Sequence, residues 1–165
     1  EGNAFLFIGC GGAAKAAAVH FAGKGGASAI FFVNRTVSKA EELCAKIAAS
    51  FPDTRCDCSS LDDDGFISEK INLVKTVIQL SSLGLKKDDP SPLNENFFIP
   101  NVSYYDTIYG DTGFLRAARK KKCPCADGLS MLIHQGAESF RIWTGIKAPL
   151  DVMKKALENK PKKMF

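Results

Sequence analysis

Residues 4–36 read AFLFIGCGGAAKAAAVHFAGKGGASAIFFVNRT. The first five of them are continuously apolar, as in a central strand of a parallel sheet that is buried on both faces. A glycine-rich turn, an alanine-rich segment and a second apolar run that ends at Val33 follow in that order. Strand, turn, helix and strand in this arrangement predict the first part of a dinucleotide-binding unit.

The glycine turn begins at Gly9 and matches the pattern G-x-G-x-x-A through Ala14. In this pattern Gly9 makes the tight turn, Gly11 leaves room for a pyrophosphate beside the backbone, and Ala14 keeps the helix close to the sheet. The helix would begin near Gly12 and Ala13, so its free N–H groups and positive dipole end would face the phosphates. The alternative is a tight structural turn in an α/β domain that binds no ligand.

The residue after the second strand distinguishes the two nicotinamide dinucleotides in such folds, because Asp or Glu there accepts hydrogen bonds from the 2′-hydroxyl of NAD. Here the position is Asn34, followed by Arg35 and Thr36, with Lys39 one helical turn further on. A carboxylate repels a 2′-phosphate, whereas these four side chains attract one, and Arg can do so in a bidentate manner. We therefore expect NADP rather than NAD. The alternative is that Arg35 and Lys39 are solvated residues of a helix start, with Thr36 as its N-cap.

Composition excludes several classes of protein. The chain of 165 residues is long enough for one domain with a substantial core, and its contents of 45% hydrophobic and 24% charged residues are ordinary for a globular protein. The net charge of +4 is mild, and the basic runs 116–122 and 160–163 contain no aromatic residues, which argues against nucleic acid as a partner. No run approaches the roughly 20 apolar residues of a membrane span, and the start has no export signal. We expect no membrane partner and a cytoplasmic location.

Six cysteines lie at positions 10, 44, 56, 58, 123 and 125. Two of the pairs are C-x-C rather than the C-x-x-C of zinc ribbons. In the strand order expected below, these two pairs lie at opposite edges of the sheet and could not converge on one ion. We therefore expect no metal site, and small buried thiols in a reducing compartment.

Beyond residue 36 the alternation of helix and strand continues. We expect helices over 38–49, 112–121, 130–141 and 148–159, strands over 55–59, 73–80, 102–109 and 123–126, and a polar connection with one helical turn over 60–70. Alternating units of this kind predict an α/β fold with a doubly wound parallel sheet between two helix layers, and with ligands at the carboxyl ends of the strands. The expected strand order is 3-2-1-4-5-6.

From Asp127 the chain reads DGLSMLIHQGA, with Phe140 and the triplet Trp143-Thr144-Gly145 beyond. This block resembles the C-terminal half of shikimate dehydrogenase, whose pattern runs D-G-x-x-M-L-x-x-Q-x-A-x-x-F-x-x-W-x-G. The start of the chain is similar to that family too, through G-x-G-G-A-A-x-A, V-N-R-T and x-K-A-E-E-L, and so is its D-x-x-Y, here Asp106 to Tyr109. The resemblance covers nearly the whole chain.

The resemblance implies that residues 1–165 form a Rossmann-like NADP-binding domain with C-terminal helices. It implies an oxidoreductase of aromatic amino-acid biosynthesis that moves hydride between NADPH and 3-dehydroshikimate. The implied cofactor residues are Gly9, Gly11, Gly12, Ala13 and Ala14 at the pyrophosphate, Asn34, Arg35, Thr36 and Lys39 at the 2′-phosphate, Ser81 and Leu83 in the groove, and Gly128 and Met131 at the nicotinamide. Tyr109 and Gln135 would reach the substrate. The plain alternatives are a core methionine, a surface glutamine and a tyrosine at a strand end.

The chain departs from the family pattern in two loops near the substrate. The family's N-x-T-x-x-G-M appears here as QLSSLGL from Gln79 to Leu85, and its Y-N-P as Tyr109-Gly110-Asp111. Shikimate, quinate and other cyclic hydroxy acids therefore all stay open as substrates.

The family's catalytic Lys and Asp lie in an N-terminal substrate domain that has no counterpart in this chain. His134 is the nearest proton donor, and we expect it to be an ordinary helix residue. The chain alone should bind nucleotide with little or no turnover. In the whole enzyme, its partners would be the missing domain and a small-molecule substrate. The alternative is a free-standing NADP-binding module that acts as a sensor or partner subunit. An exposed apolar face on the helix over 148–159 would favour a missing domain.

Overall fold

A six-stranded sheet forms the first of two units into which the chain divides. The computed structural model describes residues 3–86 and 88–158; the first unit runs to Asp127 and the second begins at Gly128. The strands are β1 (Asn3–Ile8), β2 (Ala27–Asn34), β3 (Arg55–Ser60), β4 (Thr76–Gln79), β5 (Ser103–Asp106) and β6 (Cys125–Ala126). All neighbours pair in parallel in the order β3-β2-β1-β4-β5-β6, which confirms the predicted fold class and strand order.

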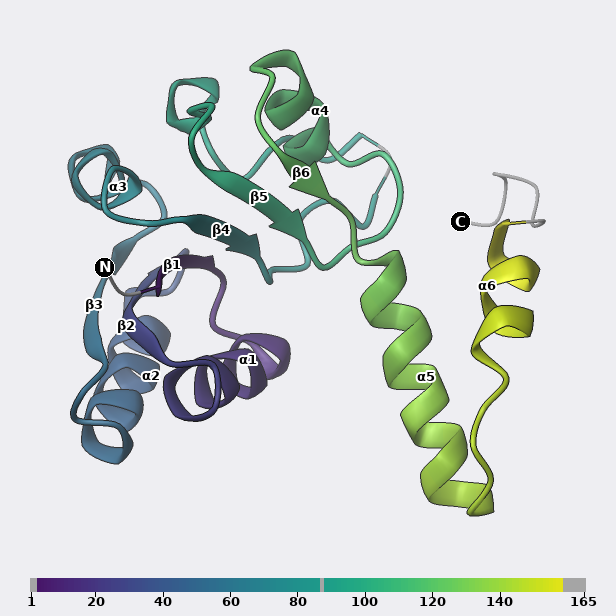
Figure 1. The fold of residues 1–165 in the computed structure, drawn as a ribbon. Helices are drawn as coiled ribbons and strands as arrows, with labels where there is room; N and C mark the ends of the chain where they lie inside the picture. Colours follow the sequence, from purple (N-terminus) through teal and green to yellow (C-terminus); the bar gives the residue numbers. More distant parts are fainter. Residues whose placement is uncertain (1–2, 87, 159–165) are drawn as a thin grey trace. The chain divides into compact units, whose positions relative to one another are not determined.

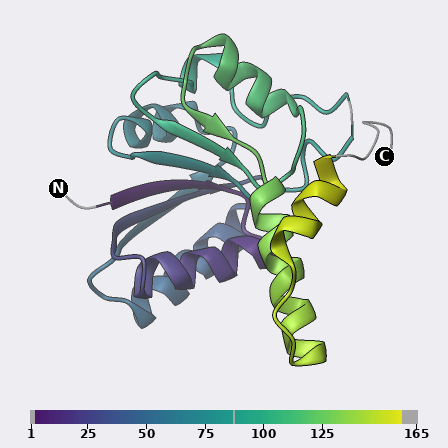
Figure 2. The same ribbon diagram turned by 45° about the vertical axis from the view of Figure 1, so that its right-hand side comes forward.

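Helices cover both faces of this sheet and complete the three layers. Helices α1 (Gly12–Gly23) and α2 (Val37–Ser50) lie on one face, and α3 (Asp64–Ile71) and α4 (Gly113–Lys120) lie on the other (Figures 1 and 2). A short 3-10 helix, η1 (Glu95–Phe97), precedes β5. Small side chains let α1 lie close to the sheet, because Ala14 and Ala18 are both fully buried on its inner side.

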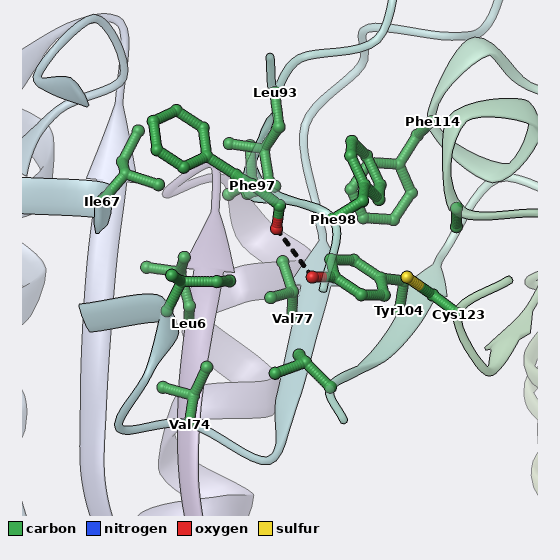
Figure 3. Close-up of a cluster of buried hydrophobic side chains, with 14 of the residues drawn as sticks. Leu6, Ile67, Val74, Val77, Leu93, Phe97, Phe98, Tyr104, Phe114 and Cys123 are labelled. Atoms are coloured by element: carbon green, nitrogen blue, oxygen red, sulfur yellow. Dashed lines mark hydrogen bonds between the residues drawn. The ribbon is translucent and has the colours of Figure 1, made fainter. Parts of the chain in front are cut away.

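The face covered by α3 and α4 holds the larger part of the core, with an aromatic group around Tyr104. The rings of Phe98 and Phe114 pack on the ring of Tyr104, with centroids 4.7 and 5.9 Å away. The Tyr104 hydroxyl donates to the Phe97 carbonyl at 2.7 Å (Figure 3) and accepts from the Ile99 N–H at 2.9 Å. One buried hydroxyl thus fixes the turn that leads from η1 into β5.

The segment 60–70 was expected to be a polar connection with one helical turn, and the helical part is longer than expected, because α3 has eight residues. Its N-cap is Asp63, whose side chain accepts from the Phe66 N–H, and its apolar residues Ile67 and Ile71 are buried. Lys70 is buried as well, since its ammonium reaches Asp57 at 2.9 Å and lies over aromatic rings. Because the segment has few apolar residues, its sequence pattern did not predict the full length of this helix.

Other predicted bounds differ by a few residues. Strand β4 is shorter than 73–80, because the Leu73 N–H turns back to the Lys70 carbonyl before the strand begins. Strands β5 and β6 are likewise shorter than the predicted 102–109 and 123–126. These runs contain buried residues outside the ladder, so apolarity alone overstates the strand length.

The second unit consists of α5 (Leu129–Thr144) and α6 (Leu150–Glu158). Helix α5 ends at Gly145, whose φ of 71° is the left-handed conformation of a glycine C-cap. The Met153 side chain of α6 lies beside Gly136 of α5. Residue 159, the end of the last predicted helix, lies outside the described residues. Within residues 3–86 and 88–158, no helix combines the length and apolarity that crossing a bilayer requires.

Candidate nucleotide-binding site

The carboxyl ends of β1, β2 and β4 lie side by side. Ile8 pairs with Val33 of β2 on one side and with Gln79 of β4 on the other. The Gly9 N–H donates to the Val33 carbonyl, and the Leu80 N–H donates to the Ile8 carbonyl, both at 2.8 Å. The glycine turn, the Asn-Arg-Thr segment and the loop after β4 therefore emerge from the same edge of the sheet, where ligands bind in such folds.

The glycine turn has the backbone that its sequence predicts. Gly9 has a φ of 101°, which favours glycine, and a Cβ at Gly9 would stand 2.8 Å from the Ser81 backbone nitrogen. Gly11 is the N-cap of α1, and the first hydrogen bond of the helix runs from the Lys15 N–H to the Gly11 carbonyl at 3.0 Å. The N–H groups of the first turn precede this bond, so they are the donors that a helix start leaves for an anion.

The space beside the turn is open. Gly11 and Gly12 are exposed, and apart from the adjoining residues and helix backbone no described atom lies within 4 Å of a Cβ built at either position. Ala13 is also exposed, whereas Ala14 is fully buried against the sheet. The turn therefore presents backbone on its outer side and packs tightly on its inner side, which is the arrangement a pyrophosphate needs.

The end of β2 presents cations and no carboxylate. The Asn34 amide nitrogen donates to the Thr36 carbonyl at 2.8 Å, which fixes the corner before α2. Thr36 occupies the N-cap position of α2, but its side chain makes no capping hydrogen bond. Arg35 and Lys39 are exposed, and neither forms an ion pair within the described part of the chain. The corner thus leaves a hydroxyl and two positive charges available to an anion.

A buried glutamine organises the loop after β4, and sequence reasoning assigned it no role. Gln79 is fully buried; its amide nitrogen donates to the Leu83 carbonyl at 2.7 Å, and its Oε1 accepts from the Ser81 N–H at 3.0 Å. The Ser81 hydroxyl in turn accepts from the Leu83 N–H at 3.2 Å. The two residues predicted to line the groove, Ser81 and Leu83, are therefore held in place. The sequence signal that could have identified Gln79 is its position as a polar residue in an otherwise apolar run.

The loop after β5 is held by a second buried polar residue, Asp106. Its carboxylate accepts from the Thr112 hydroxyl at 2.7 Å and from the Ile108 N–H at 3.0 Å. Burial is the main reason why the pKa of Asp106 is raised, and the charge of Asp127 adds to it, while the two hydrogen bonds act in the opposite direction. Tyr109, predicted to reach the substrate, stands on this loop with its side chain exposed.

The remaining predicted residues belong to the second unit. Gly128 is the N-cap of α5, and Met131 lies in the first turn with an exposed side chain. Gln135 is exposed one turn later, and its amide nitrogen donates to the Leu132 carbonyl at 3.1 Å. His134 is an exposed helix residue. Met131 is therefore not a core residue of its own unit, contrary to the plain alternative for it.

Comparison with known proteins identifies relatives along nearly the whole chain. A family model described as the Shikimate 5'-dehydrogenase C-terminal domain matches residues 128–158. The shikimate dehydrogenase (NADP(+)) of Moorella thermoacetica is 36% identical over 160 residues, which make up 94% of this chain and 53% of that protein. The chain thus spans about half the length of the curated relatives it matches.

Two solved structures share the fold. The shikimate 5-dehydrogenase of Listeria monocytogenes, solved with shikimate and NAD, has a TM-score of 0.84 and 26% identity; the match covers 94% of this chain and 56% of that one. The shikimate 5-dehydrogenase of Thermus thermophilus, solved with NADP(H) and shikimate, has a TM-score of 0.74 and 30% identity; it covers 96% of this chain and 55% of that one.

Proposed function

We propose that the chain is the C-terminal, NADP-binding half of an enzyme of the shikimate dehydrogenase family, which interconverts 3-dehydroshikimate and shikimate. The observation that carries the proposal is the pairing of an open glycine turn with the Asn34-Arg35-Thr36 corner, which has no carboxylate and whose cations Arg35 and Lys39 form no ion pair with any described residue. The cofactor supplies the hydride, and the protein supplies binding and orientation.

The glycine turn holds the pyrophosphate in this proposal. The N–H groups at Gly12, Ala13 and Ala14 start α1, where the helix dipole favours negative charge. Gly11 and Gly12 leave the approach unobstructed, since open space surrounds a Cβ built at either position.

The corner after β2 holds the 2′-phosphate. Arg35 and Lys39 supply positive charge. The Thr36 hydroxyl makes no capping hydrogen bond, so it is free to donate to the phosphate, and the hydrogen bond from the Asn34 amide to the Thr36 carbonyl fixes the backbone of the corner. Charge-assisted hydrogen bonds contribute about 1.5–3 kcal/mol, which corresponds to a preference of roughly 10- to 100-fold for the phosphorylated nucleotide. The two solved relatives carry different dinucleotides, so the preference of this chain is the quantity to measure.

The remaining predicted residues keep their assignments in this proposal. Ser81 and Leu83 line the groove, Gly128 and Met131 flank the nicotinamide, and Tyr109 and Gln135 contact the polar groups of the substrate. The loop after β4 is held by Gln79 where the family pattern has Asn. A longer amide at the base of that loop favours testing quinate and related cyclic hydroxy acids beside shikimate.

The proton-transfer groups come from a second half of the enzyme. Reduction of a ring carbonyl needs a proton donor beside the reacting oxygen, and the relatives are about twice as long as this chain. Large apolar side chains of the second unit are exposed: Ile142, Trp143, Ile146 and Val152. We propose that a further domain of the same enzyme packs against this exposed apolar surface. We expect this chain to bind nucleotide without turnover.

The first test is calorimetric titration of the chain with NADPH and with NADH. We expect NADPH to bind more tightly, and Arg35→Ala to weaken NADPH by roughly 10- to 100-fold while NADH changes little. Lys46→Ala is the matched control, because Lys46 is a cation of α2 that is already paired with Glu42. Equal affinities that Arg35→Ala leaves unchanged would contradict the cofactor assignment.

A second test separates an enzyme domain from a free-standing module. The chain is joined to the remaining half of the Moorella thermoacetica relative, and NADP reduction is followed with shikimate and with quinate. Turnover that needs both halves supports the enzyme. Nucleotide binding without any turnover in the joined protein supports a sensor or partner subunit.

A further inference from the structure

The loop after β5, residues 107–112, is held at both of its ends. The Thr107 N–H and hydroxyl both donate to the Gln79 carbonyl of the neighbouring strand, at 3.1 and 2.9 Å. At the other end, the Thr112 hydroxyl donates to the buried Asp106 carboxylate at 2.7 Å, and Thr112 is also the N-cap of α4. The ends of the loop therefore keep a fixed position beside the carboxyl ends of β4 and β5.

The middle of the loop is held by two carboxylates, one on each side of Tyr109. The Ile108 N–H donates to the Asp106 carboxylate at 3.0 Å, and the Gly110 N–H donates to the Asp127 carboxylate at 2.8 Å. Gly110 has a φ of 100°, so the backbone adopts a conformation here that residues with a side chain rarely reach. Both backbone neighbours of Tyr109 are thus fixed, one by the end of β5 and one by the residue after β6.

Tyr109 itself presents its side chain without a partner. The side chain is 44% exposed, and its hydroxyl makes no hydrogen bond with any residue in the described ranges. Asp111 is held as well, because its carboxylate pairs with Arg116 at 3.3 Å and with Arg119 at 2.6 Å. A fixed backbone that presents one unpartnered side chain is preorganised for binding, since little conformational freedom is left to lose when a ligand arrives.

We propose that Asp127 is a positioning residue of the substrate site, and that it acts by holding Tyr109 through the Gly110 N–H. The contact of Tyr109 with the substrate rests on the proposed function, whereas the hold on the loop rests on the hydrogen bonds alone. The phenol hydroxyl can donate and accept, so a tyrosine held in one place can bind one polar group of a cyclic hydroxy acid. Sequence reasoning assigned Asp127 no role at the site.

Asp127 is the anchor whose removal should release the middle of the loop and leave its ends in place. Asp106 is fully buried and also binds Thr112, so its loss would disturb the start of α4. Asp127 is partly exposed, and a charged carboxylate makes its hydrogen bond with the Gly110 N–H stronger than a neutral acceptor would. A change at Asp127 therefore tests the position of Tyr109 with the least damage elsewhere in the loop.

The first measurement is amide hydrogen exchange of the chain, resolved by residue with NMR. In Asp127→Ala the Gly110 amide should exchange at least about fivefold faster than in the native chain, while the Ile108 amide keeps its protection by Asp106. Asp127→Asn retains an acceptor oxygen and should restore most of the protection. Equal exchange of the Gly110 amide in Asp127→Ala and in the native chain would overturn the proposal.

The second measurement is the steady-state kinetics of the joined two-half protein defined above. Asp127→Ala should raise the KM for shikimate, or for quinate if quinate is the better substrate, by about 2- to 10-fold and leave the KM for NADP unchanged. Gly110→Ala should act in the same direction. A Cβ at Gly110 meets nothing within 4 Å beyond its chain neighbours, so this variant disturbs the loop only through its backbone conformation.

Asp63→Ala is the matched control for the loss of a carboxylate that accepts from a backbone N–H. The Asp63 carboxylate accepts from the Phe66 N–H at 2.9 Å at the start of α3, away from the loop after β5. Asp63→Ala should lower stability and leave both KM values unchanged. A rise of the substrate KM in Asp63→Ala as large as in Asp127→Ala would show a general effect of stability and overturn the proposal.

A double-mutant cycle separates positioning from a merely structural role. Tyr109→Phe should raise the substrate KM by itself, and Asp127→Ala should then raise it by less than about twofold further. Independent, multiplying effects would overturn the proposal, because Asp127 would act by another route. No turnover by the native joined protein with shikimate or quinate contradicts the proposed function and the substrate role of Tyr109. Exchange of the Gly110 amide still decides whether Asp127 holds the loop.

Discussion

A methyl group on Gly9 would stand 2.8 Å from the backbone nitrogen of Ser81. The glycine turn after β1 and the loop after β4 therefore pack backbone against backbone, with no space for a side chain between them. The φ of 101° at Gly9 adds a second requirement for glycine at the same position. Two loops that both line the proposed cofactor groove thus depend on one residue for their spacing.

Gly9→Ala should destabilise the first unit and abolish NADPH binding, because it combines strain at a positive φ with a steric clash. We expect a loss of about 1–3 kcal/mol in the free energy of unfolding, measured by urea denaturation. Gly11→Ala is the matched variant, since Gly11 has a φ of −78° and open space around its Cβ position. It should cost at most about 1 kcal/mol and still weaken NADPH, because the methyl group stands where the pyrophosphate approaches. Unchanged NADPH affinity in Gly11→Ala would contradict the proposed site.

Asp106→Asn should change how stability depends on pH. The pKa of Asp106 lies above its ordinary value of 3.8, so the folded protein holds this proton more tightly than the unfolded chain does. Its contribution to stability is fully present below about pH 4 and is lost as the pH rises through the folded pKa. Asn does not titrate, so the deficit of the variant relative to the native chain should shrink from pH 3 to pH 7. Urea denaturation of both proteins across this range measures it, and a deficit that grows with pH would contradict the prediction.

Tyr104→Phe should destabilise the core without changing its shape. Removing the hydroxyl leaves the Phe97 carbonyl and the Ile99 N–H without their partner in a buried place. We expect a loss of about 1–3 kcal/mol. Tyr105→Phe is the control on the same strand, because the Tyr105 hydroxyl makes no hydrogen bond within the described residues, and it should change stability by less than about 0.5 kcal/mol. Equal losses in the two variants would show that the buried hydrogen bonds are not the cause.

Lys122→Gly should stabilise the protein. Lys122 follows Lys121, the C-cap of α4, and has a φ of 57°, the only positive φ of a non-glycine residue in the described ranges; its N–H donates to the Arg119 carbonyl. Glycine adopts this C-cap conformation without steric cost, so we expect a gain of about 0.5–1 kcal/mol. Lys121→Gly, at a φ of −87°, should instead be destabilising. Differential scanning calorimetry of both variants gives the two signs.

Much of the fold could be predicted from local pattern. The apolar strands, the glycine turn and the alanine-rich helix gave the unit from β1 to β2, and the alternation beyond it gave the strand order. The extent of helix α3 was underestimated, because its burial depends on Lys70, whose charge is balanced by Asp57 of the preceding strand β3. No local pattern predicts that a lysine will be buried.

The candidate site divides in the same way. Gly9, Gly11 and the Asn-Arg-Thr corner carry signals within a few residues of each other, so their positions followed from the sequence. The roles of Gln79 and Asp106 did not, because each acts through hydrogen bonds to loop atoms that become neighbours only in the folded chain. The roles of Gly9, Gly11 and the Asn-Arg-Thr corner in nucleotide binding stay predictions.

The sequence by itself determined the order of strands and helices, because hydrophobic periodicity and glycine conformation are local properties. Only the tertiary structure decided which side chains meet across elements. It packed Cys44 of α2 and Cys56 and Cys58 of β3 against one hydrophobic cluster, and it set Gly9 against Ser81. When a helix packs on a sheet, it brings together residues that have no regular spacing in the sequence, so sequence periodicity cannot predict which of them become neighbours.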